Sequence, residues 1–301
     1  MGKGLCALSL TGITFHAMFL AIYVRIIVKN SMRHTSHIRS LDLARCLSAA
    51  GKHVFSVQDA RKYLPEDGAL WVALTRLQKA GWIKRLKRGV YMIVPLEAGI
   101  EKQWSEDAFV VACSLAQPAT VAYWSAMRHW NWTTQAPQTI YVQTTQRKWA
   151  YSRVIQGVTY RFIPIIPRKF FGVRREWIGP KAFSVTDREK TLLDILDRPD
   201  LSGGMAEVLG AIRTAVTEVD WARMDEYLKR FPNRTVLKRL GALIEKMNLS
   251  IPNRQARLAG WRRKISSGIA LLDPDARRRG GRIHTAWGIR LNIAIPSSPR
   301  A

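Results

Sequence analysis

Hydrophobic residues recur at helical spacing in the first third of the chain, and this pattern predicts three helices. Apolar side chains occur every three or four positions over residues 38–50, and a glycine follows. Ser56 is followed three residues later by Asp59, which is close to a capping box and predicts a short helix over 57–63. A Pro-Glu-Asp-Gly turn then leads into a third helix that begins near Asp67.

The third predicted helix is amphipathic, and a basic hairpin follows it. At 100° per residue, Leu70, Leu74 and Leu77 lie on one side of this helix. The opposite side carries Val72, Thr75, Arg76 and Lys79. A glycine ends the helix, and two short strands of alternating apolar residues come next. Four cations surround the turn between these strands: Lys84, Arg85, Lys87 and Arg88.

Three helices followed by a hairpin is the order of a winged helix-turn-helix, which predicts DNA binding by residues 35–95. In this motif the last helix enters the major groove, and the hairpin, called the wing, contacts phosphates. The residues expected to face base edges are Thr75, Arg76 and Lys79. The residues expected to hold phosphates are Lys84, Arg85, Lys87 and Arg88. A merely solvated basic turn is the alternative, and the two helices upstream favour the winged helix.

Residues 104–295 have a different pattern and predict a second domain of mixed α/β structure. Helical spacing occurs first, at 105–116 and 122–130, and strand-like alternation follows at 139–144, 158–163 and 174–178. Four further helices are predicted at 186–197, 205–216, 221–231 and 234–247. The predicted fold class is α+β: an N-terminal winged helix-turn-helix followed by a mixed α/β domain with a helical C-terminal part.

Residues 5–28 form a mostly apolar run of membrane-spanning length, broken by His16 and Arg25. We interpret residues 1–31 as an extension from an incorrectly assigned start, because the chain from Met32 onward reads as the beginning of a soluble domain. A membrane anchor is the alternative. A signal peptide is disfavoured, since the early positive cluster and the cleavage site are absent.

The charge of the chain points to a polyanionic partner. A net charge of +26 and a pI near 10.7 are most often associated with nucleic acid, with a membrane surface or an anionic glycan as alternatives. Three widely separated cysteines are typical of a reducing cytoplasm and predict no structural zinc. His34 and His37 have no further ligands nearby, so we expect no metal and no cofactor.

A second basic region lies near the C-terminus. Residues 253–301 contain eleven arginines and lysines against two aspartates, and tryptophans and leucines separate the basic clusters. This interleaving favours packed structure with a basic face over a solvated tail. We therefore predict a second phosphate-contacting surface that includes Arg262, Arg263 and Arg278. The last residues, 296–301, are predicted to be a disordered tail.

Carboxylates that would suit catalysis gather at Asp187, Glu189, Asp194 and Asp197. A nuclease core usually has an acid-x-lysine on a strand, whereas here acid and lysine are adjacent at the start of a helix. Thr186 and Glu189 have capping-box spacing, and the later acids lie at helical spacing from cations. No phosphate-binding loop, dinucleotide motif or nucleophile motif is present. The sequence therefore predicts no enzyme, with a metal-dependent nucleic-acid-processing enzyme as the alternative.

Segments spread over residues 35–290 together resemble the AbiEi antitoxin family of type IV toxin–antitoxin, or abortive-infection, systems. One is the winged-helix run at 74–91, and the most specific is the run at 189–199. The others are Tyr123–Met127, Ile140–Thr145, Tyr160–Phe162, Phe170–Gly172 and Leu271–Pro274. Residues 1–31 depart from the family pattern.

This resemblance implies an autorepressor and antitoxin. Its winged helix would bind inverted repeats of double-stranded DNA in its own promoter, and residues 104–295 would form the antitoxin domain. Family members counter a nucleotidyltransferase-like toxin without forming a stable complex with it, and no small-molecule substrate is implied. A plain winged-helix regulator with no toxin partner is the alternative.

Overall fold

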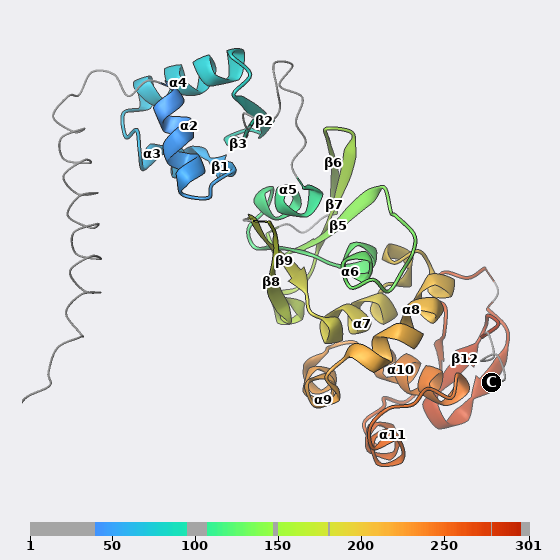
Figure 1. Ribbon diagram of the computed structural model, residues 1–301. Coiled ribbons are helices and arrows are strands. Elements are labelled where there is room, and N and C mark those ends of the chain that lie inside the picture. The colour runs from blue at the N-terminus through green and yellow to red at the C-terminus, as the bar shows by residue number, and fades with distance from the viewer. Residues whose placement is uncertain (1–39, 95–106, 147–149, 180, 278, 296–301) are drawn as a thin grey trace, which may run out of the picture.

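The computed structural model describes residues 40–94, 107–146, 150–179, 181–277 and 279–295 (Figure 1). It has the α+β class expected from the sequence. The predictions made for residues 1–31, for the tail 296–301 and for His34, His37 and Arg278 lie outside the described residues. Within the described ranges, no helix is both long enough and apolar enough to cross a membrane.

The N-terminal unit consists of three helices and a three-stranded antiparallel sheet. Its elements are α2 (Ser40–Ala49), β1 (Val54–Ser56), α3 (Val57–Arg61), α4 (Asp67–Lys79), β2 (Ile83–Lys87) and β3 (Val90–Ile93). β3 is the middle strand, between β1 and β2. The hydrophobic pattern predicted the helices and the hairpin, but it missed β1, which has three residues and shows too little alternation to be recognised.

The sheet of the N-terminal unit is buried on both faces. Tyr91 and Ile93 of β3 pack against the helices of their own unit. Val90 and Met92 point to the other face, because side chains alternate along a strand, and they join the core of the following domain. Leu86 of β2 joins the same core. The winged helix is thus docked through the back of its sheet onto the rest of the chain.

The body of the protein begins at residue 107 with a six-stranded mixed sheet of order β6-β7-β5-β4-β9-β8. Its strands are β4 (Ala119–Val121), β5 (Thr139–Thr144), β6 (Tyr151–Ile155), β7 (Val158–Pro164), β8 (Val173–Ile178) and β9 (Lys181–Thr186). The pairs β5–β7 and β4–β9 are parallel, and the other neighbours are antiparallel. Two short helices, α5 (Ala108–Ser114) and α6 (Tyr123–His129), pack against the sheet. The sequence predicted β5, β7 and β8 and missed the other three.

Helices form the C-terminal half of the body and lie at the end of the molecule away from the winged helix (Figure 1). They are α7 (Arg188–Asp197), α8 (Met205–Glu218), α9 (Trp221–Arg230), α10 (Arg234–Lys246) and α11 (Arg254–Arg262). α7 is the central one, because it contacts α6, α8, α9 and α10. A small sheet follows, with β12 (Ile289–Leu291) between β10 (Ala270–Leu271) and β11 (Arg282–His284).

Candidate nucleic-acid interface

The exposed face of α4 carries the residues expected to read bases. Leu70, Ala73, Leu74 and Leu77 are buried, as the helical periodicity predicts. Thr75, Arg76 and Lys79 are exposed on the opposite side. Neither Arg76 nor Lys79 forms an ion pair with any residue that the structure describes, so both charges are available to a partner. The structure therefore places all three residues together on one free helix face.

Two large apolar side chains share this face. Trp71 is 48% exposed and Val72 is 49% exposed, although both side chains are apolar enough to be buried in a core. The sequence pattern placed Trp71 at the edge of the buried side of the helix. A helical wheel with about 100° per residue does not determine whether a side chain at such an edge is buried or exposed. An exposed tryptophan and valine beside two cations suit contacts with thymine methyl groups.

The hydroxyl of Thr75 is already engaged within the helix. Its Oγ1 donates to the carbonyl oxygen of Trp71, one turn earlier, at 2.8 Å. The hydroxyl proton is therefore used, and the side chain offers only lone pairs and a methyl group to a partner. This makes Arg76 and Lys79 the stronger donors on the face.

α3 and the start of α4 are held in a helix-turn-helix by local interactions. Ser56 is the N-cap of α3, and its hydroxyl and backbone N–H form a complete capping box with Asp59. Arg61 at the end of α3 donates from Nη2 to the Oδ1 atom of Asp67 at 2.7 Å, which joins α3 to the first turn of α4. This ion pair is exposed, so its contribution to stability is about 0–1 kcal/mol.

The N-terminus of α4 is acidic. Glu66 occupies the N-cap position without a side-chain capping bond, and Asp67 follows it. Both carboxylates are exposed, and among the described residues only Asp67 has a cationic partner, which is Arg61. Negative charge at this end disfavours a phosphate there. The middle and the end of the helix, from Trp71 to Lys79, are therefore the better candidates for DNA contact.

Three of the four basic side chains of the wing reach the solvent, and the fourth contacts the body. Arg85 and Arg88 are exposed, and Lys84 is partly buried. Lys87 instead extends its ammonium to the carbonyl oxygen of Leu115 at the end of α5, at 2.6 Å. The structure thus brings three of the predicted phosphate ligands to the surface and assigns the fourth to the contact between the winged helix and the body.

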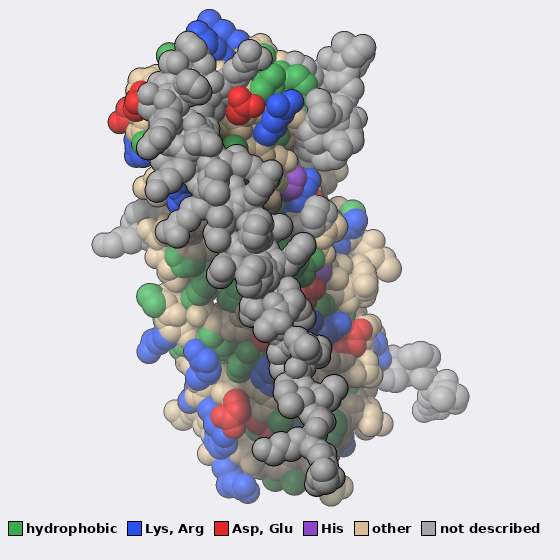
Figure 2. All heavy atoms as spheres, turned by 60° about the vertical axis from the view of Figure 1, so that its left-hand side comes forward, with side chains coloured by type: hydrophobic (Ala, Val, Ile, Leu, Met, Phe, Trp, Pro, Cys, Tyr) green, Lys and Arg blue, Asp and Glu red, His purple; other side chains and the backbone are tan. Residues whose placement is uncertain are grey.

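The second predicted basic surface is far from the first. α11, which carries Arg262, lies at the opposite end of the molecule from α4 (Figure 1). Arg262 forms an ion pair with Glu245 and lies over the ring of Trp287 at 5.3 Å, so it is partly committed to packing. Arg263 is exposed. Basic side chains are also spread along the face that Figure 2 shows, from the winged-helix end to the other end, rather than gathered into one patch.

The four carboxylates considered for catalysis each have a structural partner. Asp187 is the N-cap of α7, where it accepts from the backbone N–H of Lys190 at 2.8 Å and from the Tyr227 hydroxyl at 2.8 Å. Burial raises the pKa of this carboxyl, although these hydrogen bonds oppose the shift. Glu189 accepts from the backbone N–H of Asp220 at 2.6 Å, and so caps the start of α9 rather than its own helix. The capping box predicted for Thr186 and Glu189 is wrong for this reason.

Of the other two acids, Asp194 belongs to a buried polar cluster. Asp194 pairs with Lys190 and accepts from the side-chain amide of Gln143 at 2.8 Å. Lys190 also lies near the rings of Phe171 and Phe231, at 5.3 and 5.7 Å. Asp197, outside this cluster, accepts from Lys169 at 2.5 Å and from Asn233 at 2.6 Å. Among the described residues no group of three or more His, Cys, Asp or Glu side chains is arranged to hold a metal ion.

A three-helix unit with an exposed cationic helix and a basic wing defines the class of this domain: it is a winged helix-turn-helix of the nucleic-acid-binding type. Residues 47–94 match the family model described as "Transcriptional regulator, AbiEi antitoxin". This match confirms, over these residues, the resemblance to the AbiEi antitoxin family.

The fold of most of the chain has a counterpart among solved structures. A crystal structure of the RV2827C protein from Mycobacterium tuberculosis is similar with a TM-score of 0.56 and 17% sequence identity. The similarity covers 81% of this chain and 88% of that chain. At this identity the likeness concerns the fold alone. A comparison with curated proteins finds no match.

Proposed function

We propose that this protein is a sequence-specific DNA-binding autorepressor and the antitoxin of a type IV toxin–antitoxin operon. The observation that carries the proposal is the exposed face of α4, on which Arg76 and Lys79 have no acidic partner among the described residues. This face lies in the segment that matches the AbiEi transcriptional regulators. Cytoplasmic location and inverted promoter repeats are part of the same proposal.

In the proposed complex, α4 lies in the major groove and the wing follows the backbone. Arg76 and Lys79 donate to base edges, and Thr75 accepts or contacts a thymine methyl. Lys84, Arg85 and Arg88 neutralise phosphates. Arg263 and Arg278 remain a prediction for a separate contact, and Lys87 is left out because of its bond to Leu115.

The antitoxic role rests on the family match and on the resemblance of the body to the same family. In this proposal the protein opposes a nucleotidyltransferase-like toxin without forming a stable complex with it, and it acts without catalysis. Asp187, Glu189, Asp194 and Asp197 support the non-enzymatic part, because each is occupied by a helix terminus, a cation or an amide.

Binding measurements with three variants test the DNA contacts. Affinities for a fragment of the protein's own promoter and for random DNA are compared over a range of salt concentrations. Arg76→Ala should lose about 1–3 kcal/mol of preference for the promoter. Arg88→Ala should weaken binding to both DNAs and lower the salt slope by about 1. Arg45→Ala is the matched control, because Arg45 is an exposed arginine of the same unit that lies on α2.

Equal losses on both DNAs for Arg76→Ala and Arg88→Ala would show that the division between base and phosphate contacts is wrong. A wild-type protein that binds its promoter no more tightly than random DNA would exclude a specific autorepressor. For the antitoxin, co-expression with a neighbouring nucleotidyltransferase should restore growth, and unrelieved toxicity would contradict that role.

A further inference from the structure

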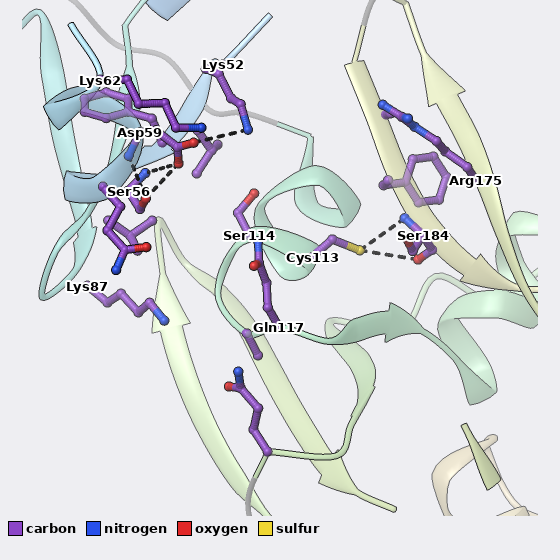
Figure 3. Close-up of a pocket in the computed structure, with 18 residues that line it drawn as sticks. Lys52, Ser56, Asp59, Lys62, Lys87, Cys113, Ser114, Gln117, Arg175 and Ser184 are labelled. Atoms are coloured by element: carbon purple, nitrogen blue, oxygen red, sulfur yellow. Dashed lines mark hydrogen bonds and ion pairs between the residues drawn. The ribbon is translucent and has the colours of Figure 1, made fainter. Parts of the chain in front are cut away.

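A cleft separates the winged helix from the body on one side of their shared hydrophobic contact. Its volume is about 580 Å³, within the range of about 300–1,000 Å³ that is usual for ligand sites. The winged helix contributes β1, α3 and Lys87, and the body contributes the end of α5 and strands β8 and β9. In Figure 3, Cys113 and Ser114 at the end of α5 lie between the residues of the winged helix and those of β8 and β9.

Cations face this cleft from both sides. In Figure 3, Lys52 and Lys62 extend from the winged helix, and Arg175 extends from β8 toward them. Lys62 and Arg175 form no ion pair with any residue in the described part of the chain. Arg175 instead lies over the ring of Trp177, at 4.7 Å. Two cations from separate units therefore face the same space without a counter-ion from the protein.

The acidic residue of the lining does not neutralise them. Asp59 is engaged by Lys52 at 3.3 Å and by the backbone N–H and hydroxyl of Ser56 at 3.0 and 2.7 Å. Burial alone would raise the pKa of Asp59, but these hydrogen bonds and the Lys52 charge hold it below its ordinary value. The carboxylate is thus ionised and internally paired, and the charge of Lys62 and Arg175 remains uncompensated.

Neutral hydrogen-bond donors complete the lining. The side-chain amides of Gln58, Gln117 and Gln146 are among the residues that surround the cleft. An arginine fork, a lysine and amide groups are the combination that recognises phosphate oxygens. An apolar ligand would leave the charged and amide groups unsatisfied.

We propose that this cleft is a binding site for phosphate groups, held mainly by Lys62 and Arg175. Because the two cations come from different units, a bound phosphate would bridge the winged helix and the body. The phosphate belongs either to the backbone of bound DNA, as it leaves the winged helix, or to a free phosphate-bearing ligand. In both cases occupancy stabilises one arrangement of the two units. The two cations that hold the phosphate lie on neither α4 nor the wing, although Lys87 of the wing also lines the cleft.

Isothermal titration calorimetry of the full chain with pyrophosphate, at low ionic strength, tests the site directly. The wild-type protein should bind one equivalent with saturation. Lys62→Gln and Arg175→Gln should each weaken this binding about tenfold, the loss expected for one charge-assisted hydrogen bond. Lys246→Gln is the control, because Lys246 is an exposed lysine at the end of α10, far from the cleft. Thermal melts of each variant verify that it is folded.

Two results would overturn the proposal. One is the absence of saturable pyrophosphate binding by the wild-type protein. The other is an equal loss in all three variants, which would reflect the net charge of +26 rather than a site. If the protein binds pyrophosphate but no DNA, the proposed function is refuted, whereas the proposed phosphate site is supported.

The same variants identify the source of the phosphate. If Lys62→Gln and Arg175→Gln each lower the salt slope of promoter binding by about 1, the phosphates are those of the DNA backbone. If promoter binding is unchanged while pyrophosphate binding is lost, the ligand is a free phosphate compound. Either result supports the site and assigns its occupant.

Discussion

The buried pair of Lys190 and Asp194 makes a sharp prediction about stability. Lys190 is fully buried and Asp194 is 2% exposed, and the carboxylate also accepts from Gln143. Burial raises the pKa of the Asp194 carboxyl in spite of the lysine beside it, so the pair does not fully recover the cost of leaving water. The two single replacements and the double replacement should therefore differ greatly in stability.

Lys190→Met keeps an unbranched side chain that is one atom shorter, but it leaves a buried carboxylate without its counter-ion. The expected loss is about 3–5 kcal/mol of unfolding free energy. Asp194→Asn leaves the lysine unpaired and should cost a similar amount. The double variant Lys190→Met/Asp194→Asn removes both charges, and its new amide can still accept from Gln143. It should lie within about 2 kcal/mol of the wild type, because neutral replacement of a buried pair is often tolerated.

Urea denaturation of the full chain, followed by tryptophan fluorescence and circular dichroism, measures these differences as a double-mutant cycle. The control is the exposed pair of Glu226 and Lys229 on α9, for which Glu226→Gln and Lys229→Met should couple by about 0–1 kcal/mol. If the losses at Lys190 and Asp194 simply add, or if Lys190→Met costs less than about 1 kcal/mol, the reasoning about this buried pair is wrong.

Two further predictions concern pH and backbone conformation. Burial among aromatic rings lowers the pKa of His129 in the folded protein. The neutral imidazole therefore contributes its full stability above the pKa of the unfolded chain, which is near 6.5. This contribution is lost as the pH falls from the unfolded pKa to the lower folded pKa. Urea midpoints measured from pH 7.5 to 5 should therefore fall less steeply for His129→Leu than for the wild type, and identical slopes would contradict this. Gly172 has φ +62°, and an added Cβ would lie 2.7 Å from the Lys190 Cβ, so Gly172→Ala should cost about 2–5 kcal/mol in the same assay. Gly157→Ala, with φ +76° and open space around it, should cost only about 1–2 kcal/mol, and equal losses at the two glycines would refute the packing argument.

The exposed face of α4 could be predicted because it depends on local sequence. Helical spacing alone places Leu70, Leu74 and Leu77 on one side, and the opposite side is then available for a partner. The capping box of Ser56 and Asp59 is similarly local, since its two residues are three positions apart.

The role of Lys87 could not be predicted, because it depends on a residue 28 positions away in the chain. A lysine in a basic turn and a lysine that joins two units have the same local sequence. The same limit applies to Lys62 and Arg175, which line the same cleft although more than a hundred residues separate them in the chain. Contacts of this kind depend on how the two units dock, and the hydrophobic periodicity of the sequence contains no information about that docking.

Three of the segments in the body that resemble the family meet at the buried pair Lys190 and Asp194 on α7. Gln143 and Lys190 come from two of these segments and share Asp194. Phe171, from a third, lies beside the Lys190 ammonium. A buried polar cluster of this kind restricts which residues each position accepts, since any unpaired member is costly. The resemblance in this region therefore reflects the construction of the core, and it does not locate the antitoxic surface.

The docking of the wing against the body has a consequence for the proposed binding to DNA. Leu86, Val90 and Met92 bury the back of the wing sheet in the body, while Lys87 adds a hydrogen bond to α5. A winged helix that is fixed in this way presents α4 and the body to DNA as one unit rather than as two tethered domains. Any change in the body that loosens this contact should then weaken promoter binding without touching a DNA-facing residue. If the proposed DNA binding is right, the body is therefore part of the DNA-binding unit, because it holds the winged helix in place.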